Sequence, residues 1–117
     1  MNETDKRPVY IQLIDEIMIK ILSSEFGPGT KLPAVRDLAL ILQANPNTVQ
    51  RALAYVEERG LIYTQRTTGK YVTEDPAVIE EARRTLAKGY AAGYLEKMKK
   101  IGFNRSEAVS FAEKEEY

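Results

Sequence analysis

The sequence of 117 residues contains no cysteine, no histidine and no tryptophan. The absence of cysteine excludes a disulfide framework, a thiolate zinc site and a cysteine nucleophile, and it fits a reducing compartment. The absence of histidine removes the commonest general base and the commonest metal ligand. Asp, Glu, Lys and Tyr leave an enzyme possible, but the usual catalytic groups are missing. We therefore expect neither a cofactor nor a metal site.

Long hydrophobic segments are also absent. The longest apolar run covers only residues 38–42, whereas a membrane-spanning helix needs about 18 apolar residues. The N-terminus mixes acidic and basic side chains and has no apolar stretch of the signal-peptide type. The sequence predicts a cytoplasmic protein without a membrane partner.

The chain has no excess charge of either sign, because 17 Lys and Arg balance 17 Asp and Glu. Net charge therefore gives no reason to expect a nucleic-acid partner. The charges are nevertheless unevenly distributed, since residues 38–56 include no acid at all. Between Asp37 and Glu74 the only acids are Glu57 and Glu58, and the same window holds Arg51, Arg59, Arg66 and Lys70. An acid-poor, basic face on a neutral protein is typical of DNA binding.

Glycine and proline divide the first part of the chain into short elements. Apolar residues at helical spacing predict a helix over residues 8–26, a second helix that opens at Pro33, and a third that Gly60 ends. Asn45 is the expected N-cap of the third helix and Pro46 its first residue. Residues 61–64 and 70–73 are β-branched and aromatic, with a polar turn between them, which predicts a hairpin. This order of elements is a winged helix-turn-helix that closes near residue 75.

The rest of the chain predicts two helices. A helical pattern runs over residues 76–101 and stops at Gly102, and Asn104 and Glu107 have the spacing of a capping box for a short final helix. The expected fold is mostly α with a small β-hairpin. Residues 1–75 are expected to form the winged helix-turn-helix DNA-binding domain, and residues 76–117 a helical dimerisation tail.

The third predicted helix carries a polar stripe opposite its apolar stripe. Asn47, Gln50, Arg51 and Ala54 share this face, and Asn and Gln can pair with adenine while Arg can pair with guanine. The alternative is an ordinary solvated helix face, and the uneven charge favours base reading. The turn over residues 65–70 is also polar, basic and free of acid. It could be a solvent-exposed hairpin tip or a wing that reaches the DNA.

Residues 32–39 resemble the Leu-Pro-Ser-x-Arg-x-Leu-Ala signature of GntR-type bacterial transcription regulators. Residues 45–53, 57–62 and 69–72 continue the same pattern in order, and residues 8–13 also match it. The resemblance covers residues 8–73, and the short two-helix tail resembles the YtrA subfamily. Two positions depart from the pattern. Ala34 replaces the usual serine, which removes a side-chain cap, and Thr67 stands where many members have a first wing glycine.

The resemblance implies a set of DNA contacts. Arg36 is expected to clamp a phosphate from the start of the second helix, with an intrahelical ion pair as the alternative. The basic wing turn adds Arg66 to the set. The full set of expected DNA-binding residues is Arg36, Asn45, Asn47, Thr48, Gln50, Arg51, Arg66, Thr68, Gly69 and Lys70.

Two helices cannot enclose a core alone, so the tail either folds back on the winged domain or pairs with a second chain. The long helix also holds small residues, which suit close contact between backbones. We favour a two-fold homodimer, as the resemblance also implies. The expected interface residues are Ile79, Ala82, Leu86, Tyr90, Gly93, Tyr94, Met98, Ile101 and Phe111.

The sequence therefore predicts a sequence-specific regulator that binds double-stranded DNA. It would act as a homodimeric repressor on a pseudo-palindromic operator, and the resemblance implies that its targets include transporter operons. A small-molecule effector would bind at the dimer interface or between tail and winged domain. The alternative from another class is a winged-helix protein–protein adaptor that does not read DNA. The numerous glutamates of the tail resemble solvated helix faces rather than catalytic acids.

Overall fold

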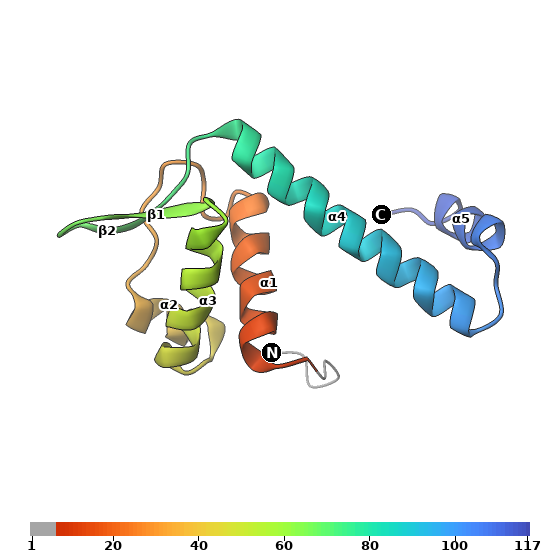
Figure 1. Ribbon diagram of the computed structural model, residues 1–117, viewed down its shortest axis with the longest axis horizontal. Coiled ribbons are helices and arrows are strands. Elements are labelled where there is room, and N and C mark those ends of the chain that lie inside the picture. The colour runs from red at the N-terminus through yellow and green to blue at the C-terminus, as the bar shows by residue number, and fades with distance from the viewer. Residues whose placement is uncertain (1–6) are drawn as a thin grey trace. The chain divides into compact units, whose positions relative to one another are not determined.

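The computed structural model describes residues 7–117, so the charged segment 1–6 lies outside the described residues (Figure 1). The described part contains five helices and one antiparallel pair of strands. In chain order they are α1 (Val9–Leu22), α2 (Val35–Leu42), α3 (Pro46–Glu58), β1 (Ile62–Gln65), β2 (Gly69–Val72), α4 (Pro76–Lys100) and α5 (Arg105–Glu113). The predicted fold class, mostly helical with a small hairpin, is confirmed.

The chain divides into two compact units between Ala82 and Arg83. The winged unit contains α1 to β2 and the first turns of α4, and the tail unit contains the rest of α4 with α5. The first turns of α4 belong to the winged unit because Val78, Ile79 and Ala82 pack against its core. The sequence prediction placed the boundary after residue 75, which lies between the end of β2 and the start of α4.

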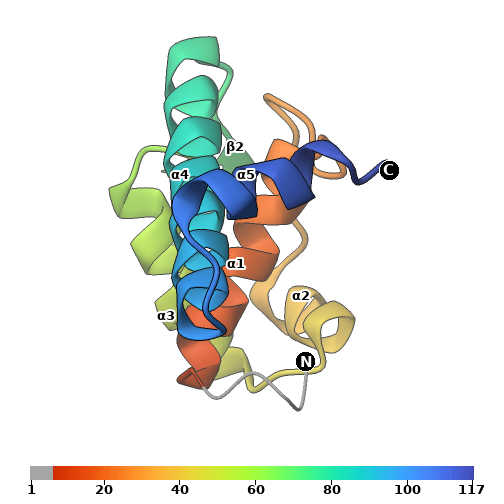
Figure 2. The same ribbon diagram turned by 90° about the vertical axis from the view of Figure 1, so that its right-hand side faces the viewer.

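The core of the winged unit lies between α1, α2, α3 and the hairpin. The helices α1 and α3 pack along each other, and α2 packs against α3 (Figures 1 and 2). Each helix buries one apolar stripe, and the hairpin adds the residues at its base. The fully buried large side chains are Leu13, Ile17, Ile21, Leu38, Val49, Leu53, Val56, Leu61, Ile62 and Val72. Burying one such side chain contributes roughly 1.5–3 kcal/mol, so this cluster holds α3 in place.

The first helix is shorter than predicted. It ends at Leu22 rather than at residue 26, because Ser24 adopts a left-handed conformation with φ 65°. The N–H of Phe26 then donates to the carbonyl of Lys20 at 2.9 Å, and the Phe26 ring still packs against the core. The apolar spacing therefore continued past the end of the helix. Pro8 is the residue before the helix rather than part of its first turn.

The start of α3 agrees with the prediction. The side chain of Asn45 accepts a hydrogen bond from the N–H of Asn47 at 2.8 Å, and Pro46 is the first helical residue. At the other end Gly60 has φ +82°, a conformation that favours glycine. The preceding helix α2 begins without a side-chain cap, as the alanine at position 34 predicted.

The hairpin forms the wing of the fold, which we define as residues 62–72. Its strands pair Ile62 with Val72 and Gln65 with Gly69. The first strand lies one residue later in the sequence than predicted, and the second lies one residue earlier. Lys31 forms an isolated bridge with Tyr71, which brings the loop before α2 alongside the wing. Thr67 adopts φ 70° in the turn, although it has a Cβ, and Gly69 adopts φ 123°.

The tail unit is built from the remainder of α4 and from α5. The predicted capping box of α5 is confirmed, since the Asn104 side chain and the Glu107 backbone N–H bond at 2.9 Å. The Tyr94 hydroxyl donates to the carbonyl of Ala108 at 2.8 Å. No residue of α4 is buried. None of the helices within residues 7–117 is both long and apolar enough to span a membrane.

Candidate nucleic-acid interface

The outer face of α3 is polar and open to solvent. Asn47, Gln50, Arg51 and Ala54 are all exposed on it. The opposite face, formed by Val49, Ala52, Leu53 and Val56, is buried in the core. The structure therefore places the predicted reading residues together on one accessible helix face.

Arg51 does not extend freely from this face. The carbon at the centre of its guanidinium lies 4.5 Å from the centre of the Tyr10 ring, a cation–π contact. Tyr10 belongs to α1 and is itself half-buried against the core. Sequence reasoning missed this contact, because the two residues lie on different helices.

Three further expected contacts lie at or near the starts of helices. Arg36 is exposed at the beginning of α2 and makes no ion pair within residues 7–117, so the alternative of an intrahelical pair does not occur there. Asn45 is also exposed, but its side-chain oxygen already caps α3. Thr48, in the first turn of α3, is half-buried. Arg36 is the unpaired cation among these three residues.

The tip of the wing is exposed. Arg66 makes no hydrogen bond or ion pair among the described residues, and Thr68 bonds only to its neighbour Gln65, at 3.3 Å. A Cβ at Gly69 would lie 3.0 Å from the Lys31 Cε, so the lysine chain crosses the wing at this glycine. Lys31 is exposed and has no ion pair within the described chain. Sequence reasoning missed this cation because only the fold brings its loop to the wing.

Lys70 was expected to contact DNA, but in the single chain its side chain binds Glu57. Its Nζ donates to the Glu57 carboxylate at 2.6 Å and to the Thr64 hydroxyl at 2.8 Å. Glu57, in the last turn of α3, therefore joins this helix to the wing. Lys70 as a phosphate contact stays a prediction, and the ion pair partly neutralises its charge.

The hydrogen bond from Lys70 is the main reason why the pKa of Glu57 lies below its ordinary value of 4.5. Thr64 also lowers this pKa, whereas partial burial raises it. The carboxylate is therefore ionised at neutral pH. The stabilisation from this pair is present above pH 4.5 and is lost as the pH falls through the lowered pKa.

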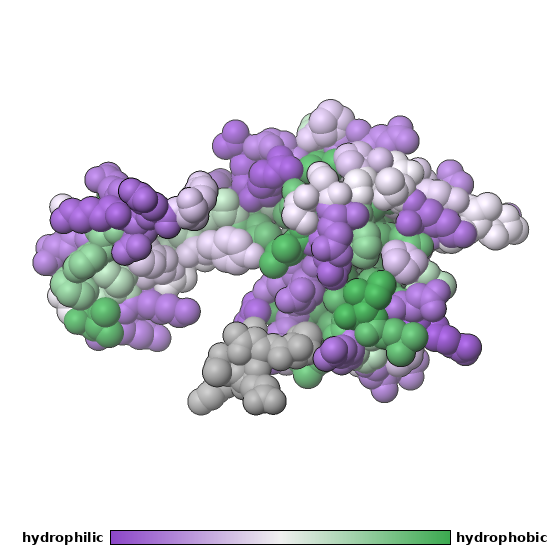
Figure 3. All heavy atoms as spheres, turned by 180° about the vertical axis from the view of Figure 1, so that it is seen from behind, coloured by the Kyte–Doolittle hydropathy of each residue, from purple (hydrophilic) through white to green (hydrophobic). Residues whose placement is uncertain are grey.

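The expected interface residues of the tail fall into two groups. Ile79, Ala82, Leu86, Tyr94 and Met98 are half-buried within one chain, the first two of them against the winged core. Tyr90, Gly93, Ile101 and Phe111 are exposed, and Tyr90 and Ile101 keep 56% and 68% of their surface open. The space-filling view shows apolar surface on the tail unit among hydrophilic side chains (Figure 3). The second group is part of the apolar surface that the tail unit leaves exposed in a single chain.

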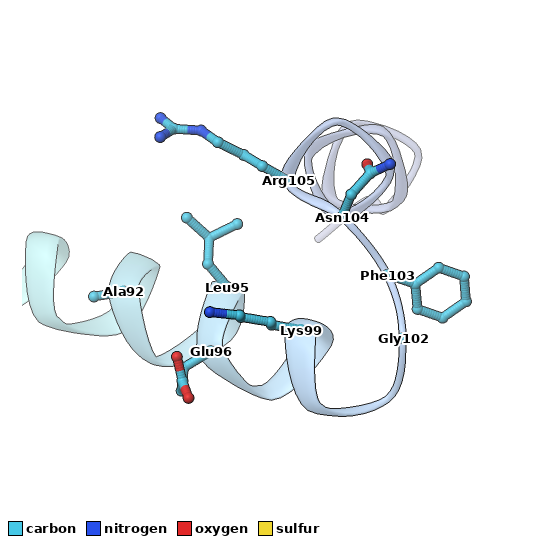
Figure 4. A pocket seen from close by; sticks show the side chains of 8 residues that line it. All are labelled: Ala92, Leu95, Glu96, Lys99, Gly102, Phe103, Asn104 and Arg105. Atoms are coloured by element: carbon cyan, nitrogen blue, oxygen red, sulfur yellow. The ribbon is translucent and has the colours of Figure 1, made fainter.

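A groove of about 570 Å³ lies between the end of α4 and the start of α5. Leu95, Phe103 and Arg105 are among the residues that line it, and Leu95 points toward the segment that carries Arg105 (Figure 4). Phe103 packs edge-on against Phe111 at 5.0 Å between ring centres. Within residues 7–117 no group of three or more acidic side chains is placed to hold a metal ion.

These features define a winged helix-turn-helix protein, with an exposed polar face on α3 beside a basic wing. The family model described as bacterial regulatory proteins, gntR family, matches residues 9–72, which is more than half of the chain. The chain belongs to this GntR family, and it is a DNA-binding transcriptional regulator.

Similar proteins extend the likeness into the tail. The chain is 33% identical over 103 residues to the uncharacterized HTH-type transcriptional regulator YhcF of Bacillus subtilis, covering 88% of this chain and 85% of that protein. It is 38% identical over 94 residues to the HTH-type transcriptional repressor YtrA of the same organism, covering 80% and 68%. The structure of a GntR family regulator from Listeria monocytogenes superposes with a TM-score of 0.84 at 39% identity, over 96% of this chain and 98% of that one.

Proposed function

We propose that the protein is a transcriptional repressor that binds a pseudo-palindromic operator as a homodimer. The observation that carries the proposal is the exposed face of Asn47, Gln50 and Arg51 on α3, directly opposite the buried stripe. The similar protein YtrA is named a transcriptional repressor, which supports repression rather than activation. By the resemblance to this subfamily, the regulated genes include a transporter operon.

The proposed complex places α3 of each subunit in a major groove. Asn47 and Gln50 would pair with adenine, and Arg51 with guanine through two parallel hydrogen bonds. The cations without an ion pair at the edges of this face, Arg36 and Arg66, would contact phosphates. In a homodimer the two half-sites lie about 34 Å apart, or a multiple of this distance.

Arg51→Ala is expected to weaken binding to the operator far more than binding to random duplex. A lost base contact of about 1–3 kcal/mol corresponds to a loss of roughly 5- to 150-fold per half-site. The measurement is an affinity titration on an operator selected in vitro from a random library, on its single-base variants and on random duplex. Arg51→Lys is the matched variant, because it keeps the charge but lacks the planar fork. Equal losses on operator and random DNA would make Arg51 a phosphate contact and refute base reading.

The two cations of the wing are expected to differ in their contribution to salt dependence. Arg66→Ala should reduce the slope of log affinity against log salt by about 1 per subunit, because an unpaired cation releases counterions from the DNA. Lys70→Ala should reduce it less, because Lys70 already pairs with Glu57 at 2.6 Å. Both slopes can be measured on random duplex. A larger change for Lys70→Ala would show that the ion pair opens on the DNA.

The adaptor function has one observation in its favour. Leu40 and Ile41 of α2 are exposed apolar side chains on the winged unit, and such residues can contact another protein. An adaptor that ignores DNA would show no steep salt slope on any duplex. The same titration therefore separates the two functions.

A further inference from the structure

Two arginines, Arg51 in α3 and Arg59 directly after its end, lie over tyrosine rings, but in different ways. Arg59 lies 4.0 Å from the ring centre of Tyr55, one turn earlier on the same helix, and also donates to the Tyr55 hydroxyl. Arg51 lies 4.5 Å from the ring centre of Tyr10, which belongs to α1. Of these two pairs, only Arg51 and Tyr10 lie at the exposed polar face of α3 and join two helices of the winged unit.

The Tyr10 ring forms a surface against which the Arg51 side chain lies. It packs against the buried core, and its helix packs along α3. The Tyr10 hydroxyl makes no hydrogen bond within residues 7–117, so the ring itself makes the contact. A cation–π contact uses the face of the ring and leaves the N–H groups of the guanidinium available to other acceptors.

Holding an arginine in place matters for base reading. A free arginine side chain samples many rotamers, and ordering them when DNA binds weakens the complex. A guanidinium that is already held over a ring avoids part of this loss. The gain in affinity appears only for a base that can accept two parallel hydrogen bonds from the guanidinium. A wrong base cannot accept them, so it gains nothing from a guanidinium that is already in place.

We propose that Tyr10 is a positioning residue, which presets Arg51 for its base and so sets discrimination at one base pair without touching the DNA. This inference rests on the proposed function, in which Arg51 reads a base. It assigns a specificity role to a helix that lies behind the reading helix.

The test compares Tyr10→Leu with Tyr10→Phe in the full chain. The discrimination ratio is the affinity for the selected operator divided by that for the operator changed at the base pair that Arg51→Ala identifies. Tyr10→Leu is expected to lower this ratio about 2- to 5-fold, the value of one exposed cation–π contact. Tyr10→Phe keeps the ring and is expected to leave it unchanged. Because the ratio compares two DNAs with one protein sample, partial unfolding of a variant cancels.

A double variant and a matched control complete the test. In the Arg51→Ala background, Tyr10→Leu is expected to have no further effect on the ratio, since the positioned group is gone. Tyr55→Leu removes the other tyrosine–arginine contact of α3 and is expected to leave the ratio unchanged. An unchanged or increased ratio for Tyr10→Leu, or an equal decrease in both backgrounds, would overturn the positioning role while base reading by Arg51 stands. Full discrimination at every base pair in Arg51→Ala would overturn both.

Discussion

Tyr90→Asp is expected to separate the proposed homodimer into monomers and to lower operator affinity by about 10²–10⁴-fold. Tyr90 is 56% exposed in the single chain, so the variant tests the contact between subunits rather than the fold of one. An aspartate in an apolar seam must stay charged without a partner or take up a proton, and both are unfavourable. Each monomer would then bind one half-site, without the gain from two linked contacts. Sedimentation and titrations on full and half operators measure both effects.

Thr85→Asp is the matched control for this variant. It introduces the same charge at another exposed position of α4, about 140° around the helix from Tyr90. It is expected to stay dimeric and to bind the full operator normally. If Tyr90→Asp sedimented as a dimer, or if its monomer bound the full operator as tightly as the unmodified protein, the proposed dimer interface around Tyr90 would be wrong.

Leu38→Ala is expected to reduce the free energy of unfolding by about 2–5 kcal/mol. Leu38 of α2 is 0% exposed and belongs to the core that holds α3. Its removal leaves a cavity and loses the transfer free energy of the side chain. Small proteins are stable by only about 5–15 kcal/mol, so a loss of this size is a large share of the total. Urea unfolding followed by circular dichroism gives the value.

The same helix provides the control for this prediction. Leu40 lies two residues later on α2 and is 74% exposed, so Leu40→Ala makes the same chemical change outside the core. We expect it to change the unfolding free energy by less than about 0.5 kcal/mol. Comparable losses for the two variants would mean that Leu40 packs against a partner under the conditions of the experiment.

Local signals in the sequence predicted most of α3 and which of its faces is exposed. Asn45 and Pro46 mark the start of this helix through capping and a fixed φ, and both roles appear in the structure. The apolar stripe at helical spacing separates buried from exposed residues, which also placed Asn47, Gln50 and Arg51 on the outer face. These predictions depend on neighbours within one turn of helix, and such neighbours are adjacent in the sequence.

The end of α1 shows why some boundaries escape this reasoning. Phe26 continues the apolar spacing of the helix, yet the chain leaves the helix at Leu22 and brings the ring back to the core by another path. Periodicity reports which side chains are buried, and a helix is only one way to bury them. The pattern therefore misplaced the helix end by four residues.

The sequence by itself determined the winged helix-turn-helix, the exposed polar face of α3 and the two helices of the tail, since each depends on short-range patterns. Only the tertiary structure decided which partners the charged side chains take. It placed Arg51 over Tyr10, paired Lys70 with Glu57 and brought Lys31 to the wing. These partners lie on separate elements, and their distances follow from how the core packs rather than from any spacing along the chain.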